Sequence, residues 1–578
     1  LKANTTGANN VAVGHSALAS NTTASNNTAV GHQAGLNNTA SYLAAVGYRA
    51  LTSNTTGAQN TAMGYEAGVT NTTGGNLSAF GLQAGYSNTT GSSNTFIGAN
   101  AARANSTGSY NAAIGDGSLY SNTTSSNNTA VGYQAGYSNT SSGANTFVGH
   151  QSGYSNTGSN NSAFGYGSLR LNTSGVFNVA VGLQSLYSNT TTSNSTAVGY
   201  QAGYSNTSGG VQAFGYLALR ANTTGIQNHA FGNQALDANT TGAFNTAMGG
   251  YALSANTTAS NNTAVGYQAG YSTTTGERNT AMGVQSLYTN TTGSFNSAFG
   301  RTALYFNTTG QQNVANGQDA LFSNTTGSYN VAVGKSALET NTTASNATAV
   351  GYQAMYSNTT GGENVGVGRE ALRSNTTGGS NTAVGYQAGN FTTTATNSTF
   401  IGRRAGYANT TGAGNTGIGG EAGLSLTTSS YNTALGFRAL KLTTTASNNT
   451  AVGTFALQAN TTGASNVAVG GYSLLSNTTA NNSTAVGYQA GYTGTTNGDG
   501  TYVGYQAGYS RTGSGNTCVG NYSGRDGTTG TDNTFAGRNS GYTITSGSKN
   551  TIIGMYNGNQ NGLDIRTSSN NIVLSDGA

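Results

Sequence analysis

A short repeat runs through almost the whole chain and constrains its fold more than any other feature. A glycine that follows an apolar residue recurs from Gly14 to Gly554 in 33 copies, which we call the marker glycines. The interval is 17 residues, except for four intervals of 16 that end at Gly47, Gly165, Gly215 and Gly520. A fixed period of this kind is typical of solenoids. We therefore predict a repeat region over residues 1–554 and an exit segment over residues 555–578.

The residues of each period favour strands and turns. Gly and Asn are disfavoured in helix interiors, while the β-branched Thr and Val before the marker glycine prefer strands. The Asn-Thr-Thr-Gly cluster of each period is typical of a turn. The predicted fold is all-β, an elongated parallel β-solenoid (β-roll) of about 33 coils. Stacking at about 4.8 Å per coil would give a rod of roughly 160 Å.

Two columns of the repeat suggest how a coil is built. The residue before the marker glycine is apolar in 32 of 33 copies, with Asn316 the exception, and we predict that it points into a core. On this assignment, Val198→Asp should cost several kcal/mol. Three residues after the glycine, Ala or Ser occurs in 32 copies, with Asn557 the exception.

The same columns bear on assembly. Neighbours on a strand point to opposite faces, so the Ala-Val pair makes both faces of its strand apolar. This favours a parallel homotrimer, with the small Ala/Ser column at the common axis. The alternative is a single-chain solenoid whose own Asn-Thr-Thr-Gly loop covers the second face.

Polar and aromatic columns allow two interpretations each. Asn lies four residues before the marker glycine in 25 of 33 copies, which predicts a hydrogen-bonded ladder at a left-handed corner, with ligand contact as the alternative.

Sequons such as Asn4-Thr5-Thr6 and Asn222-Thr223-Thr224 leave glycosylation open. Tyrosines five residues after the glycine predict rings stacked over the coil corner, or a stripe that binds sugars or surfaces: Tyr86, Tyr120, Tyr137, Tyr154, Tyr187 and Tyr204.

The composition argues against catalysis. Charged residues make up 6% of the chain and there are only four His. His15 and His32 follow marker glycines in adjacent coils and could stack, but other residue types fill their column, so we predict no metal site. Asp526 and Asp532 lack the spacing of calcium-binding β-rolls. Cys518 is the single cysteine, which excludes an internal disulfide. We predict no enzyme, no catalytic or cofactor-binding residues and no cofactor.

The basic residues are too dispersed along the sequence to predict binding to nucleic acid, and the apolar residues are too dispersed to predict insertion in a membrane. The net charge is +5, and no basic run is longer than Arg403-Arg404, so we predict no nucleic-acid partner. No stretch approaches the roughly 20 apolar residues of a membrane span, which predicts no membrane insertion. The chain begins at Leu1 without Met, and we interpret it as part of a longer protein.

The unit Asn-Thr-Ala-Val-Gly-Tyr-Gln-Ala resembles the head repeats of trimeric autotransporter adhesins, whose period is shorter. It is more similar to the repeat regions of long fibre proteins of tailed bacteriophages. Residues Gly562–Arg566 and Asn571–Gly577 look like the exit from such repeats. The resemblance implies a non-enzymatic tail or head fibre shaft on the virion surface, a homotrimer joined at its ends to other virion proteins and able to adhere to host-surface glycans.

Two other functions share this sequence pattern. A bacterial surface adhesin or extracellular filament would use the same repeat outside a cell. An ice-binding solenoid would need a flat rank of outward Thr, which the four 16-residue intervals and the Ala/Ser substitutions are expected to interrupt.

Overall fold

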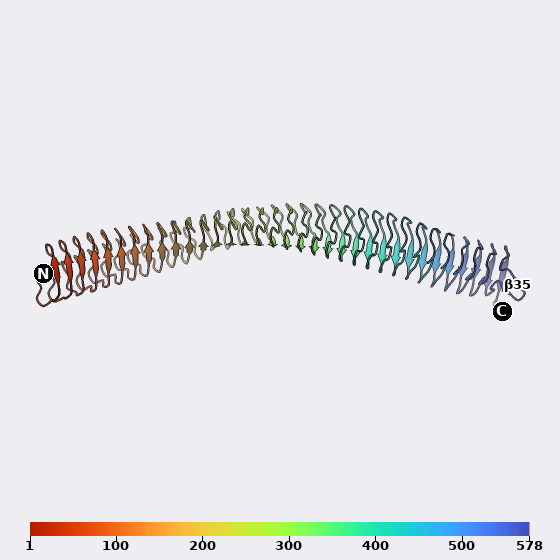
Figure 1. Cartoon of the computed structure of the whole chain (residues 1–578), viewed down its shortest axis with the longest axis horizontal. Helices are drawn as coiled ribbons and strands as arrows, with labels where there is room; N and C mark the ends of the chain where they lie inside the picture. The colour runs from red at the N-terminus through yellow and green to blue at the C-terminus, as the bar shows by residue number, and fades with distance from the viewer. Residues whose placement is uncertain (497, 577–578) are drawn as a thin grey trace. The chain divides into compact units, whose positions relative to one another are not determined.

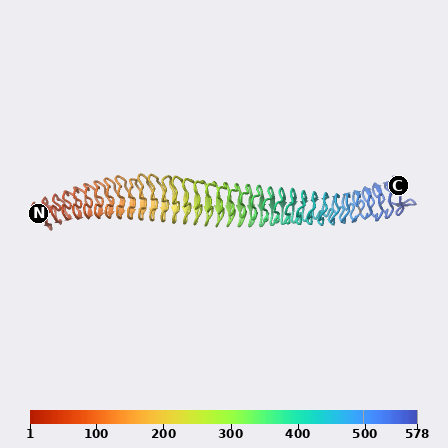
Figure 2. The same cartoon turned by 90° about the horizontal axis from the view of Figure 1, so that it is seen from above.

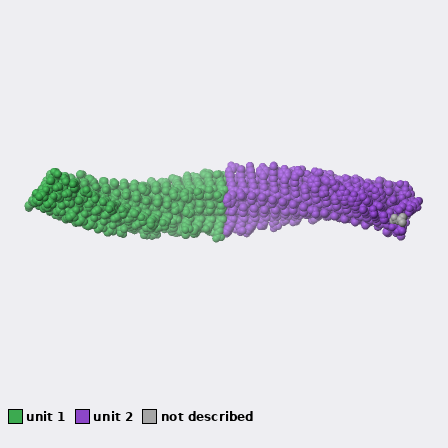
Figure 3. Space-filling view, turned by 90° about the horizontal axis from the view of Figure 1, so that it is seen from below, with its two compact units in different colours: residues 1–292 green, residues 293–578 purple. Residues whose placement is uncertain are grey.

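The computed structural model describes residues 1–496 and 498–576, and the chain divides into two compact units. Unit 1 covers Leu1–Thr292 and unit 2 covers Gly293–Ala578, shown in green and purple in Figure 3. Each unit is described by itself.

Unit 1 is a stack of three-residue parallel strands, each paired with the next along the chain (Figure 1). Its strands are β1 (Val11–Val13), β2 (Thr28–Val30), β3 (Ala44–Val46), β4 (Thr61–Met63), β5 (Ser78–Phe80), β6 (Thr95–Ile97), β7 (Ala112–Ile114), β8 (Thr129–Val131), β9 (Thr146–Val148), β10 (Ser162–Phe164), β11 (Val179–Val181), β12 (Thr196–Val198), β13 (Gln212–Phe214), β14 (His229–Phe231), β15 (Thr246–Met248), β16 (Thr263–Val265) and β17 (Thr280–Met282).

Unit 2 repeats the same arrangement and ends differently. Its stacked strands are β18 (Ser297–Phe299), β19 (Val314–Asn316), β20 (Val331–Val333), β21 (Thr348–Val350), β22 (Val365–Val367), β23 (Thr382–Val384), β24 (Thr399–Ile401), β25 (Thr416–Ile418), β26 (Thr433–Leu435), β27 (Thr450–Val452), β28 (Val467–Val469), β29 (Thr484–Val486), β30 (Thr501–Val503), β31 (Thr517–Val519), β32 (Thr534–Ala536) and β33 (Thr551–Gly554). A small antiparallel hairpin follows, made of β34 (Asn559–Gln560) and β35 (Leu563–Asp564). The last strand, β36 (Ile572–Ser575), then pairs in parallel with β33.

Each unit is therefore an all-β parallel solenoid, which confirms the predicted fold class and the spacing of about 17 residues. No helix in the described part of the chain has the length and apolar character of a membrane span.

The turns between the strands also stack by hydrogen bonds, so a coil is held along its whole length. Figure 2 shows these turns repeating from coil to coil within each unit. In one such turn the amide of Thr55 donates to the carbonyl of Thr72 at 2.8 Å, and the amide of Asn76 donates to the carbonyl of Ala58 at 3.0 Å. In the 16-residue intervals it is the turn that is one residue shorter. The strand register is unchanged, because Thr28 still pairs with Ala44 in the strand ladder.

The marker glycine is required by the backbone. Gly132 has φ of 133°, and a Cβ added there would lie 2.5 Å from the carbonyl oxygen of Gly149 in the next coil. A side chain at this position would be strained by its φ and would also collide with neighbouring backbone. The repeat of this glycine follows from the close stacking of successive coils.

The inward residue of each strand is the one two positions before the marker glycine, so the sequence-based assignment was wrong. Ala197 is fully buried, whereas its neighbour Val198 on the same strand is only partly buried. The residue before the glycine is half-exposed in many coils, as in Met63 (50%) and Leu435 (42%). Both positions are apolar, so hydrophobicity alone did not distinguish the two faces of the strand.

This orientation changes the expected effect of a charge at Val198. Because the side chain lies on the outer face, Val198→Asp should change the local free energy of opening in a single, unassembled chain by no more than about 1 kcal/mol. Native-state hydrogen exchange of the β11–β13 amides measures it. A loss of several kcal/mol would restore the original inward assignment.

The interior is packed by complementary large and small residues. The buried Ala column of the strand faces the position four residues after the marker glycine, where Leu fills the space in many coils, such as Leu169 and Leu186. Where the strand instead carries a ring, this position in the same coil is glycine, except for Ala102 in the coil of Phe96. Phe147 packs on Gly136 and Gly153, and Phe400 packs on Gly389 and Gly406.

Candidate functional site

Two columns of buried asparagine form ladders along each stack. In the predicted column, the backbone N–H of Asn111 donates to Oδ1 of Asn94 at 2.8 Å, and Nδ2 of Asn128 donates to Oδ1 of Asn111 at 3.2 Å, so the predicted ladder is confirmed. The left-handed backbone lies one residue earlier, for example at Asn127 with φ of 62°. A second ladder, not predicted from the sequence, joins Asn88 Nδ2 to Asn71 Oδ1 at 2.7 Å.

The second ladder includes the asparagines of the sequons Asn4-Thr5-Thr6 and Asn222-Thr223-Thr224. Asn222 is fully buried, and its Nδ2 donates to Asn206 Oδ1 at 2.7 Å and to the carbonyl of Gly225 at 2.9 Å. A glycan on this nitrogen cannot be accommodated in the fold, because both of its hydrogen atoms are used inside the coil. Asn222 is therefore structural.

The predicted tyrosine columns stack on themselves. Tyr137 lies between Tyr120 and Tyr154, at ring-centroid distances of 4.9 and 5.1 Å and nearly parallel planes. The sequence also contains a second aromatic column directly after the marker glycine, in which Tyr48 stacks on Tyr65 at 5.1 Å. Rings of this second column are about half exposed, so they present faces and hydroxyls to solvent.

Three of the four histidines join these stacks. His15 and His32 lie face to face at 5.2 Å with an interplanar angle of 10°. His150 lies between Tyr133 and Tyr166, while His229 begins β14. Over residues 1–496 and 498–576, no group of three or more His, Cys, Asp or Glu side chains is arranged to hold a metal ion.

Stacking gathers charged residues that are far apart in the sequence. Between residues 369 and 441 of unit 2, all eight charged residues lie one, two or five positions after a marker glycine, and therefore on one corner of the coils. We call them the basic corner: Arg369, Glu370, Arg373, Arg403, Arg404, Glu421, Arg438 and Lys441. Six positive and two negative side chains leave a local excess of four charges, against +5 for the whole chain.

The expectation that basic residues form no cluster on one face was therefore wrong. Runs along the sequence do not reveal a cluster whose members recur at the coil period. Aligning the charged residues on the marker glycines would have revealed it.

The two carboxylates of the basic corner are ionised near neutral pH. A hydrogen bond from Gln387 lowers the pKa of Glu370. Burial raises the pKa of Glu421, but hydrogen bonds from Arg438 and Lys441 outweigh this and hold it below its ordinary value. Arg438 Nε lies 2.9 Å and Lys441 Nζ 3.4 Å from Glu421 Oε2.

A buried guanidinium lies near the end of the solenoid in unit 2. Arg511 is 1% exposed and occupies the position that asparagine takes in the second ladder. Its nitrogens donate to the carbonyls of Gly524 and Ile544, each at 3.2 Å, and its guanidinium carbon lies 4.6 Å from the ring centre of Phe535. The group is satisfied inside the coil, so its role is structural.

The single thiol lies beside this guanidinium. Burial raises the pKa of Cys518 to about 11, although the charge of Arg511 acts in the opposite direction. The thiolate is the nucleophilic form of cysteine, so this side chain is unreactive at neutral pH while the coil is closed.

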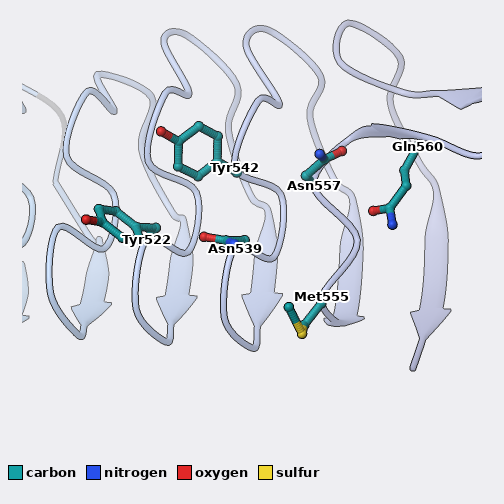
Figure 4. Close-up of a pocket in the computed structure, with 6 residues that line it drawn as sticks. All are labelled: Tyr522, Asn539, Tyr542, Met555, Asn557 and Gln560. Carbon is teal, nitrogen blue, oxygen red and sulfur yellow. The ribbon is translucent and has the colours of Figure 1, made fainter. Parts of the chain in front are cut away.

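A pocket of about 800 Å³ lies where the repeat gives way to the hairpin, and Figure 4 shows its lining. The lining residues are Tyr522, Asn539, Tyr542, Met555, Asn557 and Gln560. Asn557 is the one large residue in the otherwise small Ala/Ser column. Two tyrosine side chains and three amides provide ring surface and hydrogen-bonding groups, which suit a small polar ligand such as a sugar.

The outer face of each sheet carries an apolar column, which we call the outer strip: the residues immediately before the marker glycines. In unit 1 it includes half-exposed side chains such as Met63, Ile97, Phe164 and Met248. The Ala/Ser column that suggested a trimer axis is instead buried in the chain's own core, as in Ala135 and Ser152.

The regularity of the outer face decides whether it could bind ice. The strand ladder continues in register across the 16-residue intervals, contrary to expectation. The outward ranks are nevertheless uneven, since Gln212 and His229 replace Thr and large rings such as Phe214 replace Val. An uneven face is a poor match for an ice lattice.

A scan against protein-family models and a search of curated proteins found no match for this chain.

Proposed function

We propose that the chain is a non-enzymatic structural shaft of a virion tail or head fibre, exposed outside cells. The observation that carries this proposal is the uniform stacking within each unit, where each strand of the repeats up to β33 pairs in parallel with the next strand of its unit and buried asparagine ladders follow the stack. Such a structure supplies length and stiffness, since each coil contacts only its neighbours. The resemblance to phage fibre repeats supports the virion assignment over a bacterial adhesin.

The proposed assembly is a parallel homotrimer in which copies cover one another's outer strips. An exposed apolar column that continues through all turns but that of Asn316 favours burial against a partner. Copies in parallel register would place equivalent residues side by side in every coil. The small free energy of association from each coil would then add up along each unit. Other virion proteins would attach at the ends.

Native mass spectrometry tests the assembly. The expected mass is about three times the 57.8 kDa of one chain. Replacing Met248, Met282 and Val265 on neighbouring strands by Lys should shift the population toward single chains, because it places charges on the outer strip while leaving the core unchanged. A parent mass of 57.8 kDa would contradict the trimer.

Immunogold electron microscopy tests the location. Antibodies raised against the purified chain should decorate fibres on purified phage particles. Decoration of filaments on bacterial cells instead would favour the adhesin, and inhibition of ice growth by the purified chain would favour the ice-binding alternative.

A further inference from the structure

The basic corner extends over five successive turns of unit 2, from the marker glycine Gly368 to Gly436. At about 4.8 Å per turn, its charged groups are distributed over roughly 19 Å. Arg369 and Arg403 occupy the same position in two of these turns, and their side chains are 60% and 66% exposed. The corner therefore presents a line of positive charge parallel to the stack.

The two carboxylates of the corner leave two of its six cations without an acidic partner. Glu421 contacts Arg403, Arg438 and Lys441, and Glu370 contacts Arg369. Arg373 and Arg404 have no carboxylate within ion-pair distance among the described residues. The Nε of Arg404 is buried without a hydrogen-bond partner in that part of the chain, an unfavourable state for a guanidinium.

Aromatic rings lie against these cations. The guanidinium of Arg369 lies 5.7 Å from the ring centre of Tyr352 and 5.8 Å from that of Tyr386. Arg404 lies 4.3 Å from the ring of Tyr407. Tyr352 and Tyr386 remain 43% and 41% exposed, so part of each ring is free for another contact.

These two features fit one class of ligand. Guanidinium groups bind carboxylates and sulfates through paired hydrogen bonds, and exposed rings pack against the C–H faces of sugars. A linear ligand with an acidic group on its repeating units could follow the corner from turn to turn. A single small anion would contact only one or two of the cations, whereas a linear polyanion would contact cations in several turns.

We propose that the basic corner binds an acidic polysaccharide, with Arg369 and Arg403 as its outermost contacts and the Tyr352–Tyr386 rings as the surface for sugar faces. The choice of a polysaccharide over a nucleic acid rests on the proposed role as an outward-facing fibre. The presence of a polyanion site rests on the arrangement of charges alone.

Calorimetric titration with an oligogalacturonate long enough to span five turns tests this site. The purified full chain should bind it at low salt and bind its methyl ester, which has the same sugar rings without charge, at least about tenfold more weakly. The variant Arg369→Gln/Arg403→Gln should lose about fivefold to tenfold in affinity, because two exposed charges are removed.

A matched control removes two charges from the same position of other coils in unit 2. Arg301 and Lys335 also follow marker glycines and are exposed, so Arg301→Gln/Lys335→Gln should change affinity less than about twofold. Circular dichroism of both variants should match the parent.

Three results would overturn the proposal. They are absence of binding at low salt, equal binding of acid and methyl ester, and equal losses in the two double variants. Tighter binding of a single-stranded oligonucleotide that depends on Arg369 and Arg403 would assign the site to nucleic acid instead. None of these results alters the mass and labelling tests of the fibre, so the two proposals can fail separately.

Discussion

Phe147→Ala is expected to destabilise its coil by about 3–5 kcal/mol, the range for removing a buried aromatic ring. The ring is fully buried between coils whose facing positions are Gly136 and Gly153. Neither glycine has a side chain that could fill the resulting cavity. Because each coil contacts only its neighbours, the loss should be local. Native-state hydrogen exchange of the β9 amides and of the adjacent strands measures it.

A compensating substitution sharpens this prediction. A Cβ at Gly153 would lie 2.4 Å from the Phe147 ring, so Gly153→Leu alone should be strongly destabilising. In Phe147→Ala/Gly153→Leu the pair becomes the Ala and Leu of other coils, and most of the stability should return. Leu169 and Leu186 adopt the required positive φ in their coils, at 52° and 46°.

The matched control is Phe164→Ala on the next strand. Phe164 is 40% exposed on the outer strip of a single chain, so its loss should cost about 1 kcal/mol or less when both variants are compared in single chains, for example in the background with Lys at positions 248, 265 and 282. The packing rule would be refuted if Phe147→Ala behaved like Phe164→Ala, or if the double variant were no more stable than Phe147→Ala.

Arg511→Ala is expected to cost about 3 kcal/mol or more in the last turns of unit 2. The substitution removes the guanidinium donors to the buried carbonyls of Gly524 and Ile544 and leaves a cavity beside Phe535. An unsatisfied buried acceptor typically costs about 1–3 kcal/mol. Arg538→Ala, which removes the same charge from an exposed position nearby, should have little effect.

Cys518 provides the measurement, because it is the only thiol in the chain. Its labelling by a thiol reagent requires the coil to open. A loss of about 3 kcal/mol corresponds to a roughly hundredfold faster labelling where opening is a rapid equilibrium. Equal labelling rates in Arg511→Ala and the parent would show that the guanidinium does not support this region.

The raised thiol pKa gives this region a pH dependence. The folded thiol holds its proton up to a pKa of about 11, above its ordinary value. The contribution of this group to stability is therefore complete below the ordinary thiol pKa and decreases as the pH rises toward about 11. Labelling measured over this range must be corrected for the larger fraction of reactive thiolate.

A second variant tests why arginine occurs at position 511. Gly527 has the same position in the next coil, and a Cβ there would lie 2.4 Å from the Arg511 guanidinium. Gly527→Asn should therefore displace the arginine and destabilise the coil. Arg511→Asn/Gly527→Asn would restore asparagine in both coils and should be more stable than Gly527→Asn alone.

The sequence by itself determined the period, the strand class and the asparagine ladder. The period fixes which residues share a column. The residue types at Asn111 and at the marker glycines are explained by close stacking of backbones, which recurs identically in every coil. Such local, repeated requirements appear directly in the residue pattern.

Only the tertiary structure decided which face of each strand is inside and which charges meet. Ala197 and Val198 are both apolar. The space between the strand and the turn is narrow and admits the smaller side chain, Ala197. How narrow it is depends on the residue at the facing position, four residues after the marker glycine. Arg369 and Arg403 are separated by 34 positions in the sequence and share a corner because coils stack in register. These properties arise from contacts between coils, so no single repeat unit contains them.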